Sequence, residues 1–125
     1  MEALRKYFEN TRGTGVIATA DADGKVNSAV YSRPHFLEDG SLAFIMRDRL
    51  THHNLQSNPH AAYLFVEEGP GYRGKRLHLT KIAEDGDMDR IQTLTRRQYK
   101  NEKEGGRFLV SFQVDKELPL IGAGK

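Results

Sequence analysis

The sequence contains no cysteine, which excludes disulfides, thiolate catalysis and iron–sulfur clusters. It also lacks any apolar run near the ~20 residues that a membrane-spanning helix needs. Residues 1–12 carry charges at Glu2, Arg5, Lys6 and Glu9 and have no apolar stretch typical of a signal peptide. We therefore expect a cytoplasmic protein with no membrane partner.

A strong net charge is lacking as well. The formal net charge is +2, too small to favour nucleic acid as a partner. The densest basic stretch, residues 90–100, is followed directly by acidic residues at 102 and 104, so we interpret it as a solvated helix face. The length of 125 residues suits a single domain spanning 1–125.

Short apolar segments joined by turn signals make up most of the chain. Alternation and turn residues predict six strands, at residues 16–20, 26–32, 42–46, 61–66, 75–84 and 108–114. Helical spacing predicts three helices, within 1–12, over 51–57 and from 85 onward. This order favours a mainly β protein, an antiparallel barrel with short helices at its ends, over the strand–helix alternation of a dinucleotide-binding domain.

Two features invite interpretations that the spacing does not support. Residues 69–74 spell G-x-G-x-x-G, but the dinucleotide motif must open a helix, and here a strand is predicted to follow. This segment either only joins two strands or also folds over a ligand, with Tyr72 and Arg73 at its tip. Among the five histidines, His52 and His53 are adjacent and point about 100° apart on a helix, so no metal site is expected. No catalytic residue can be picked out.

The segment with the most chemistry is residues 47–54. Arg47 and Arg49 precede a helix that Thr51 is expected to cap. A helix N-terminus offers free N–H groups and partial positive charge to a phosphate, and arginine adds charge-assisted hydrogen bonds. The alternative is an ordinary capped helix with solvated arginines.

The segment from residue 15 to residue 67 resembles the pyridoxamine 5′-phosphate oxidase-like superfamily of FMN-binding split β-barrels. The resemblance lies in GVIAT at 15–19, DGK at 23–25, AVYSRP at 29–34, DG at 39–40, LAFI at 42–45 and NLQSNPHAAYLF at 54–65. The last block is the most specific. The family implies a six-stranded antiparallel split barrel that works as a homodimer, with the flavin near the interface.

The resemblance also implies which residues bind the cofactor. It places the FMN phosphate at Arg49 and Thr51. The whole cofactor-binding set it implies is Tyr31, Ser32, Arg33, Phe44, Ile45, Met46, Arg47, Arg49, Leu50, Thr51 and His52. In this set the isoalloxazine ring lies along the second and third strands.

Two departures limit what the resemblance implies. Many relatives carry a lysine where this chain has Thr51, so the phosphate would depend more on Arg49 and the helix end. The C-terminal residues 118–125 contain no basic cluster to hold a second phosphate, so vitamin B6 oxidase activity is not implied.

The sequence therefore predicts an FMN-binding flavoprotein, either a small-molecule oxidoreductase or an electron-transfer protein, served by a small-molecule or protein electron donor. Arg33 is the candidate for a positive charge near the ring; otherwise it is a surface arginine at a strand end. The rival hypothesis is a non-catalytic cofactor-binding or sensory module that holds flavin or haem on the same barrel.

Overall fold

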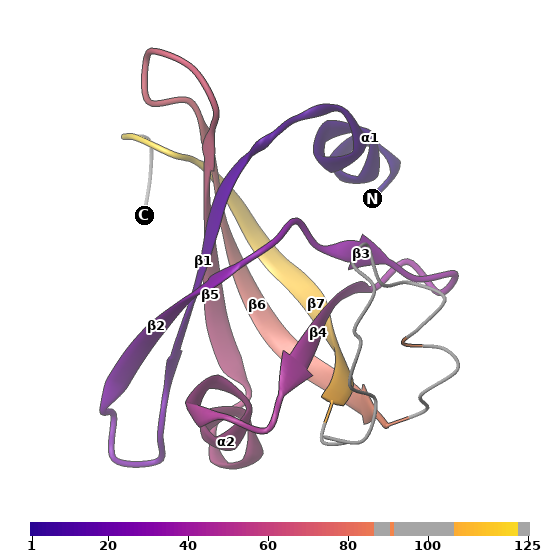
Figure 1. Cartoon of the computed structure of the whole chain (residues 1–125), viewed down its shortest axis with the longest axis vertical. Coiled ribbons are helices and arrows are strands. Elements are labelled where there is room, and N and C mark those ends of the chain that lie inside the picture. The colour runs from indigo at the N-terminus through magenta and orange to yellow at the C-terminus, as the bar shows by residue number, and fades with distance from the viewer. Residues whose placement is uncertain (87–90, 92–106, 123–125) are drawn as a thin grey trace, which may run out of the picture.

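A computed structural model describes residues 1–86, 91 and 107–122 of the chain. The described residues form one strongly curled antiparallel sheet with the strand order β2-β1-β5-β6-β7-β4-β3 (Figure 1). Its strands are β1 (Gly13–Ala20), β2 (Val26–Tyr31), β3 (His35–Phe36), β4 (Leu42–Arg47), β5 (His60–Glu67), β6 (Gly74–Asp85) and β7 (Arg107–Pro119). The curl brings β2 and β4, which lie far apart in the strand order, to face each other across an open side.

Large apolar side chains on the concave face of the sheet form the core. Side chains alternate along each strand, so one face of β1, β4, β5, β6 and β7 points inward. The fully buried members include Ile17, Tyr63, Phe65, Leu77 and Phe112. Each such side chain contributes about 1.5–3 kcal/mol by leaving water. This core sets the curvature of the sheet and therefore the spacing between β2 and β4.

Helix α1 (Glu2–Asn10) covers one end of this core. Its buried residues Leu4 and Phe8 are four positions apart, so they lie on the same face of the helix. The Phe8 ring packs edge-on against Phe65 with centroids 5.1 Å apart. The helix thus closes the end of the half-barrel opposite helix α2 (Figure 1).

Helix α2 (Leu50–Ser57) connects β4 to β5 at the other end. It is attached by Leu55 in the core and by a buried hydrogen bond from Asn54 Nδ2 to Thr19 Oγ1 of β1, at 3.1 Å. The prediction that Thr51 caps this helix is wrong. Arg49 is the N-cap residue without a side-chain capping bond, and Thr51 lies in the first turn.

The sheet differs from the six-stranded prediction at two places. The two residues of β3 form a seventh strand, too short to show any alternation. Strand β7 runs on to Pro119 through a segment without periodicity, because backbone pairing with β6 continues to the Lys75–Pro119 pair. The helix predicted from residue 85 onward falls outside the described residues except for Asp85, Gly86 and Ile91. Asp85 is the last residue of β6, and Ile91 is fully buried. No helix of the described residues is long and apolar enough to cross a membrane.

A close approach between β1 and β5 positions the end of β2. Tyr63 is fully buried on β5, and its hydroxyl donates to Ser32 O at 3.0 Å, with Tyr31 O at 3.4 Å. To reach these carbonyls the hydroxyl passes Gly15, where a Cβ atom would collide with it. Gly15 is thus required for the path of the Tyr63 side chain.

We expect Gly15→Ala to destabilise the protein by roughly 1–3 kcal/mol, because the added methyl group overpacks a filled site. Urea unfolding gives this change directly. Gly86→Ala is the matched control, since open space surrounds that position. Equal stability of the two variants would contradict the proposed role of Gly15.

Candidate functional site

The open side of the half-barrel contains a cavity of about 870 Å³ between β2, β4 and the start of α2. This volume lies within the ~300–1,000 Å³ usual for small-molecule sites. The residues that line it are Asn27, Ser28, Ala29, Val30, Tyr31, Ser32, His35, Phe44, Ile45, Arg47, Arg49, Leu50 and Thr51. One end is basic and polar, and the walls contain apolar and aromatic side chains.

The basic end, which we call the phosphate corner, consists of Arg47, Arg49 and Thr51. The two exposed arginines flank the start of α2, whose first intrahelical bond runs from His53 N–H to Arg49 O at 2.9 Å. The N–H groups of residues 50–52 therefore have no acceptor within the helix. Free N–H groups, the helix dipole and two guanidinium groups together suit a bound dianion.

Tyr31 joins the phosphate corner to the wall of the cavity. Its ring packs edge-on against Phe44 of β4, with centroids 5.9 Å apart. Burial raises the pKa of the Tyr31 hydroxyl, although its hydrogen bond with Thr51 and the charge of Arg49 act in the opposite direction. Tyr31 is therefore protonated at neutral pH and can donate a hydrogen bond at the corner.

The structure brings most of the predicted site residues to this cavity. Those that line it are Tyr31, Ser32, Phe44, Ile45, Arg47, Arg49, Leu50 and Thr51. The sequence prediction missed Asn27, Ser28, Ala29, Val30 and His35. Alternation along β2 could have indicated Asn27 and Ala29, which share a face with Tyr31. Asn27 Nδ2 lies 3.5 Å from Thr51 Oγ1, so it reaches the corner itself.

Arg33 does not lie in this cavity. Strand β2 ends at Tyr31, so the strand alternation does not extend to Arg33. Its guanidinium donates to the carbonyls of Phe8 at 2.8 Å and Thr11 at 3.3 Å, at the C-terminal end of α1. A cation at a helix C-terminus is favourable. Arg33 instead lines a separate cavity of about 610 Å³.

Met46 and His52 also lie away from the cavity. Met46 is fully buried in the main core. His52 points from α2 toward β6 and β7, about 100° around the helix from Thr51. Neither residue lines the cavity wall.

The glycine-rich loop does not cover the cavity of its own chain. It follows the end of β5 that is distant from α2 (Figure 1). Strand β6 begins at Gly74, one residue before the predicted start, and a strand at this position excludes the dinucleotide motif. At the tip, Tyr72 is 77% exposed. Among the described residues, no group of three or more His, Asp or Glu side chains is placed to hold a metal ion.

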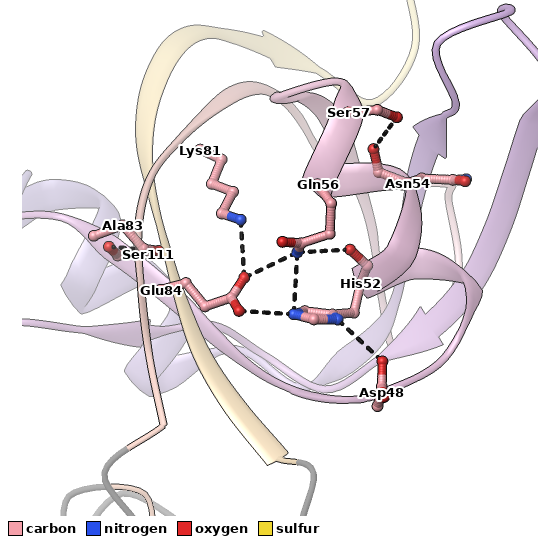
Figure 2. Close-up of polar contacts among 9 residues, drawn as sticks. All are labelled: Asp48, His52, Asn54, Gln56, Ser57, Lys81, Ala83, Glu84 and Ser111. Carbon is pink, nitrogen blue, oxygen red and sulfur yellow. Dashed lines mark hydrogen bonds and ion pairs between the residues drawn. The ribbon is translucent and has the colours of Figure 1, made fainter.

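A polar network surrounds the buried His52 ring (Figure 2). His52 Nε2 lies 2.9 Å from Glu84 Oε2, and Lys81 Nζ lies 2.8 Å from Glu84 Oε1. Gln56 Nε2 donates to the same Oε1 atom at 3.0 Å. Burial alone raises the pKa of Glu84, but hydrogen bonds from Lys81, His52 and Gln56 and the charge of His52 lower it to about 2.

A curled antiparallel half-barrel with a ligand-sized cavity along its edge strand is a split β-barrel. The family model described as pyridoxamine 5′-phosphate oxidase matches residues 1–116. The chain therefore belongs to the pyridoxamine 5′-phosphate oxidase family, as the sequence motifs predicted.

Solved structures share this fold. An FMN-binding protein from Syntrophomonas wolfei subsp. wolfei is 20% identical with a TM-score of 0.73, over 98% of this chain and 87% of that one. HupZ of Group A Streptococcus is 17% identical with a TM-score of 0.69, over 99% and 98%. An F420 reductase is 15% identical with a TM-score of 0.69, over 90% and 94%. No curated protein matches the chain.

The network at Glu84 predicts a specific loss of stability in acid. The pKa of Glu84 is about 2 in the folded protein, against an ordinary value of 4.5. The contribution of this carboxylate is therefore complete above about pH 4.5 and disappears as the pH falls toward 2. In urea unfolding, Glu84→Gln should be much less stable than the parent at neutral pH, and this gap should shrink as the pH falls to about 3.

Glu9→Gln, which changes an exposed carboxylate outside this network, is the matched control. A stability gap for Glu84→Gln that stays constant across this pH range would contradict the assignment.

Proposed function

We propose that the chain is a flavoprotein that binds FMN in the cavity between β2 and β4. The observation that carries this proposal is the combination of a basic helix N-terminus with an adjoining aromatic wall in one cavity. FMN has the same two parts, a dianionic phosphate and a flat apolar ring. The family match and the FMN-binding neighbour support the choice of this ligand.

The residues present fit the phosphate. Arg47 and Arg49 precede the α2 N-terminus, line the cavity and are both exposed. Thr51 Oγ1 and the Tyr31 hydroxyl add neutral donors at the same corner. Two guanidinium groups compensate a dianion without the lysine that many relatives carry in place of Thr51.

The residues also fit the ring. Ala29 and Tyr31 of β2 and Phe44 and Ile45 of β4 line the cavity, and they supply an apolar and aromatic wall for a planar ligand. When bound, FMN supplies electron or hydride transfer. The chain itself contributes phosphate binding, ring orientation and exclusion of water from one face.

We further propose that the protein works as a small-molecule oxidoreductase or an electron-transfer protein. The F420 reductase among the structural neighbours supports a redox role. Anaerobic stopped-flow reduction of the FMN-loaded protein by NADH and by NADPH tests it. We expect one nucleotide to reduce the bound flavin faster than it reduces free FMN. Reduction no faster than that of free FMN by either nucleotide would contradict a nicotinamide-dependent oxidoreductase and would favour the electron-transfer protein or a binding module.

We expect Arg49→Ala to weaken FMN binding by roughly 1.5–3 kcal/mol, about 10- to 150-fold, because it removes charge-assisted hydrogen bonds to the phosphate. Riboflavin, which lacks the phosphate, should bind the variant and the parent nearly equally. Equilibrium dialysis measures both affinities. Arg5→Ala on α1 removes the same charge far from the cavity and is the control. Equal losses for FMN and riboflavin would show that Arg49 does not contact the phosphate.

We also propose that a second copy of the chain covers the cavity. Its rim carries exposed apolar side chains, with Val30 75% and Leu50 53% exposed, and Val26 at the start of the same edge strand is 84% exposed. Exposed apolar side chains along an edge strand and the adjoining helix start are typical of an interface. A two-fold pair would bury the rim and place the flavin near both subunits.

Sedimentation should therefore give a mass of about 28 kDa, twice the 14.2 kDa of one chain. Val26→Asp should shift the equilibrium toward the monomer, because it places a carboxylate in the apolar contact. Ile82→Asp, at an exposed position on β6, is the control. A parent protein that sediments as a monomer with FMN bound would contradict a shared site.

A further inference from the structure

His52 is held between two carboxylates from different parts of the fold (Figure 2). Its side chain is only 8% exposed. On one side, Nε2 lies 2.9 Å from Glu84 Oε2 at the end of β6. On the other side, Nδ1 lies 3.4 Å from Asp48 Oδ1, in the segment just before α2. A buried histidine in this position can respond to charge at the helix start.

The hydrogen-bond pattern decides which nitrogen atoms carry protons. Glu84 is ionised at neutral pH and can only accept, so Nε2 of His52 must be the donor. Gln56 Nε2 also lies 3.1 Å from this nitrogen, but its two protons go to His52 O at 3.1 Å and Glu84 Oε1 at 3.0 Å. Gln56 therefore does not require Nε2 as an acceptor.

The surroundings of Nδ1, the second ring nitrogen, favour the doubly protonated imidazolium form of His52. In a neutral ring with a proton on Nε2, the lone pair of Nδ1 faces the Asp48 carboxylate, and Nδ1 is buried with no hydrogen-bond partner among the described residues. A second proton turns this repulsion into attraction. The imidazolium form thus satisfies both sides of the ring.

The remaining neighbours of His52 are compatible with a positive charge. On β6 the network also contains Lys81, which is itself bound to Glu84. On β7 the Phe108 ring stacks on the imidazole with centroids 4.1 Å apart and an angle of 6°. Arg107, the residue before Phe108 on β7, is also buried. Within the network, the negative charges of Asp48 and Glu84 balance the positive charges of protonated His52 and Lys81.

We propose that His52 couples proton uptake to phosphate binding at the phosphate corner, as a positioning residue that does not touch the ligand. This inference rests on the FMN site proposed above. His52 directly follows Thr51 in the first turn of α2, so its charge acts on a phosphate bound at that turn. The hydrogen bond to Glu84 also ties the first turn of the helix to β6. Because linkage is reciprocal, a bound phosphate favours the protonated ring as much as the proton favours the phosphate.

The pH-dependence of FMN affinity tests this coupling. Equilibrium dialysis from about pH 5.5 to about pH 8.5 brackets the titration range of histidine. As the pH rises from about 5.5 to about 8.5, the FMN affinity of the parent should fall about threefold to tenfold more than that of His52→Gln. This is the size of effect expected for a charge in the first turn of a helix. The phosphate of FMN itself titrates near pH 6, but this contribution is common to all variants and cancels in the comparison.

Matched variants separate charge from structure. His53→Gln changes the exposed neighbour on the same helix and should follow the parent curve. Glu84→Gln should move the midpoint of the curve to lower pH, because a neutral amide stabilises the imidazolium less than a carboxylate does. Riboflavin should show no difference between parent and His52→Gln. A purely structural role would weaken binding at every pH by the same factor.

A second measurement needs no variant of His52. Nitrogen chemical shifts of the His52 ring near pH 7 should move toward the imidazolium values when FMN is added, and should move less with riboflavin. Parallel pH curves for parent and His52→Gln, or ring shifts that FMN leaves unchanged, would overturn the coupling while the FMN site stands. A parent protein that takes up no FMN would overturn the proposed function and the coupling together.

Discussion

The placement of α2 on the sheet is the constraint on which the candidate site depends. The helix is held at three points, by Leu55 in the core, by the buried Asn54–Thr19 hydrogen bond, and by the His52–Glu84 contact. These contacts come from β1 and β6 as well as the core, so the helix can neither rotate nor slide without breaking a buried polar contact, which is costly. The N-terminal turn of α2 is therefore presented to the cavity in a fixed orientation.

The other half of the site follows from the curl of the sheet. Because β2 lies at one edge and β4 near the other, the curl brings their side chains to face each other without closing the barrel. The Tyr63 hydroxyl fixes the end of β2 because it donates hydrogen bonds to the carbonyls of Tyr31 and Ser32. The apolar wall of the cavity therefore meets the phosphate corner at Tyr31. The same opening leaves apolar residues exposed on β2, which accounts for the proposed pairing with a second copy.

Sequence patterns predicted the parts of the molecule that local chemistry determines. Alternation located the long strands, and the arginines before a short helix located the phosphate corner. Tertiary contacts decided the rest. Arg33 was expected near the ring, but β2 ends two residues earlier and the carbonyls of α1 bind its guanidinium. His52 was expected at the cofactor, but its partner Glu84 is 32 positions away in the sequence, and no local signal pairs them. Strand β3 is too short for any pattern to show.

The central claim is that this cavity binds FMN through its phosphate corner. The most direct test is native mass spectrometry of the purified protein together with its absorbance spectrum, before and after addition of FMN. We expect a bound mass equal to FMN, one per chain, with a flavin spectrum. A Soret band from bound haem, or a protein that stays ligand-free at micromolar FMN, would contradict it.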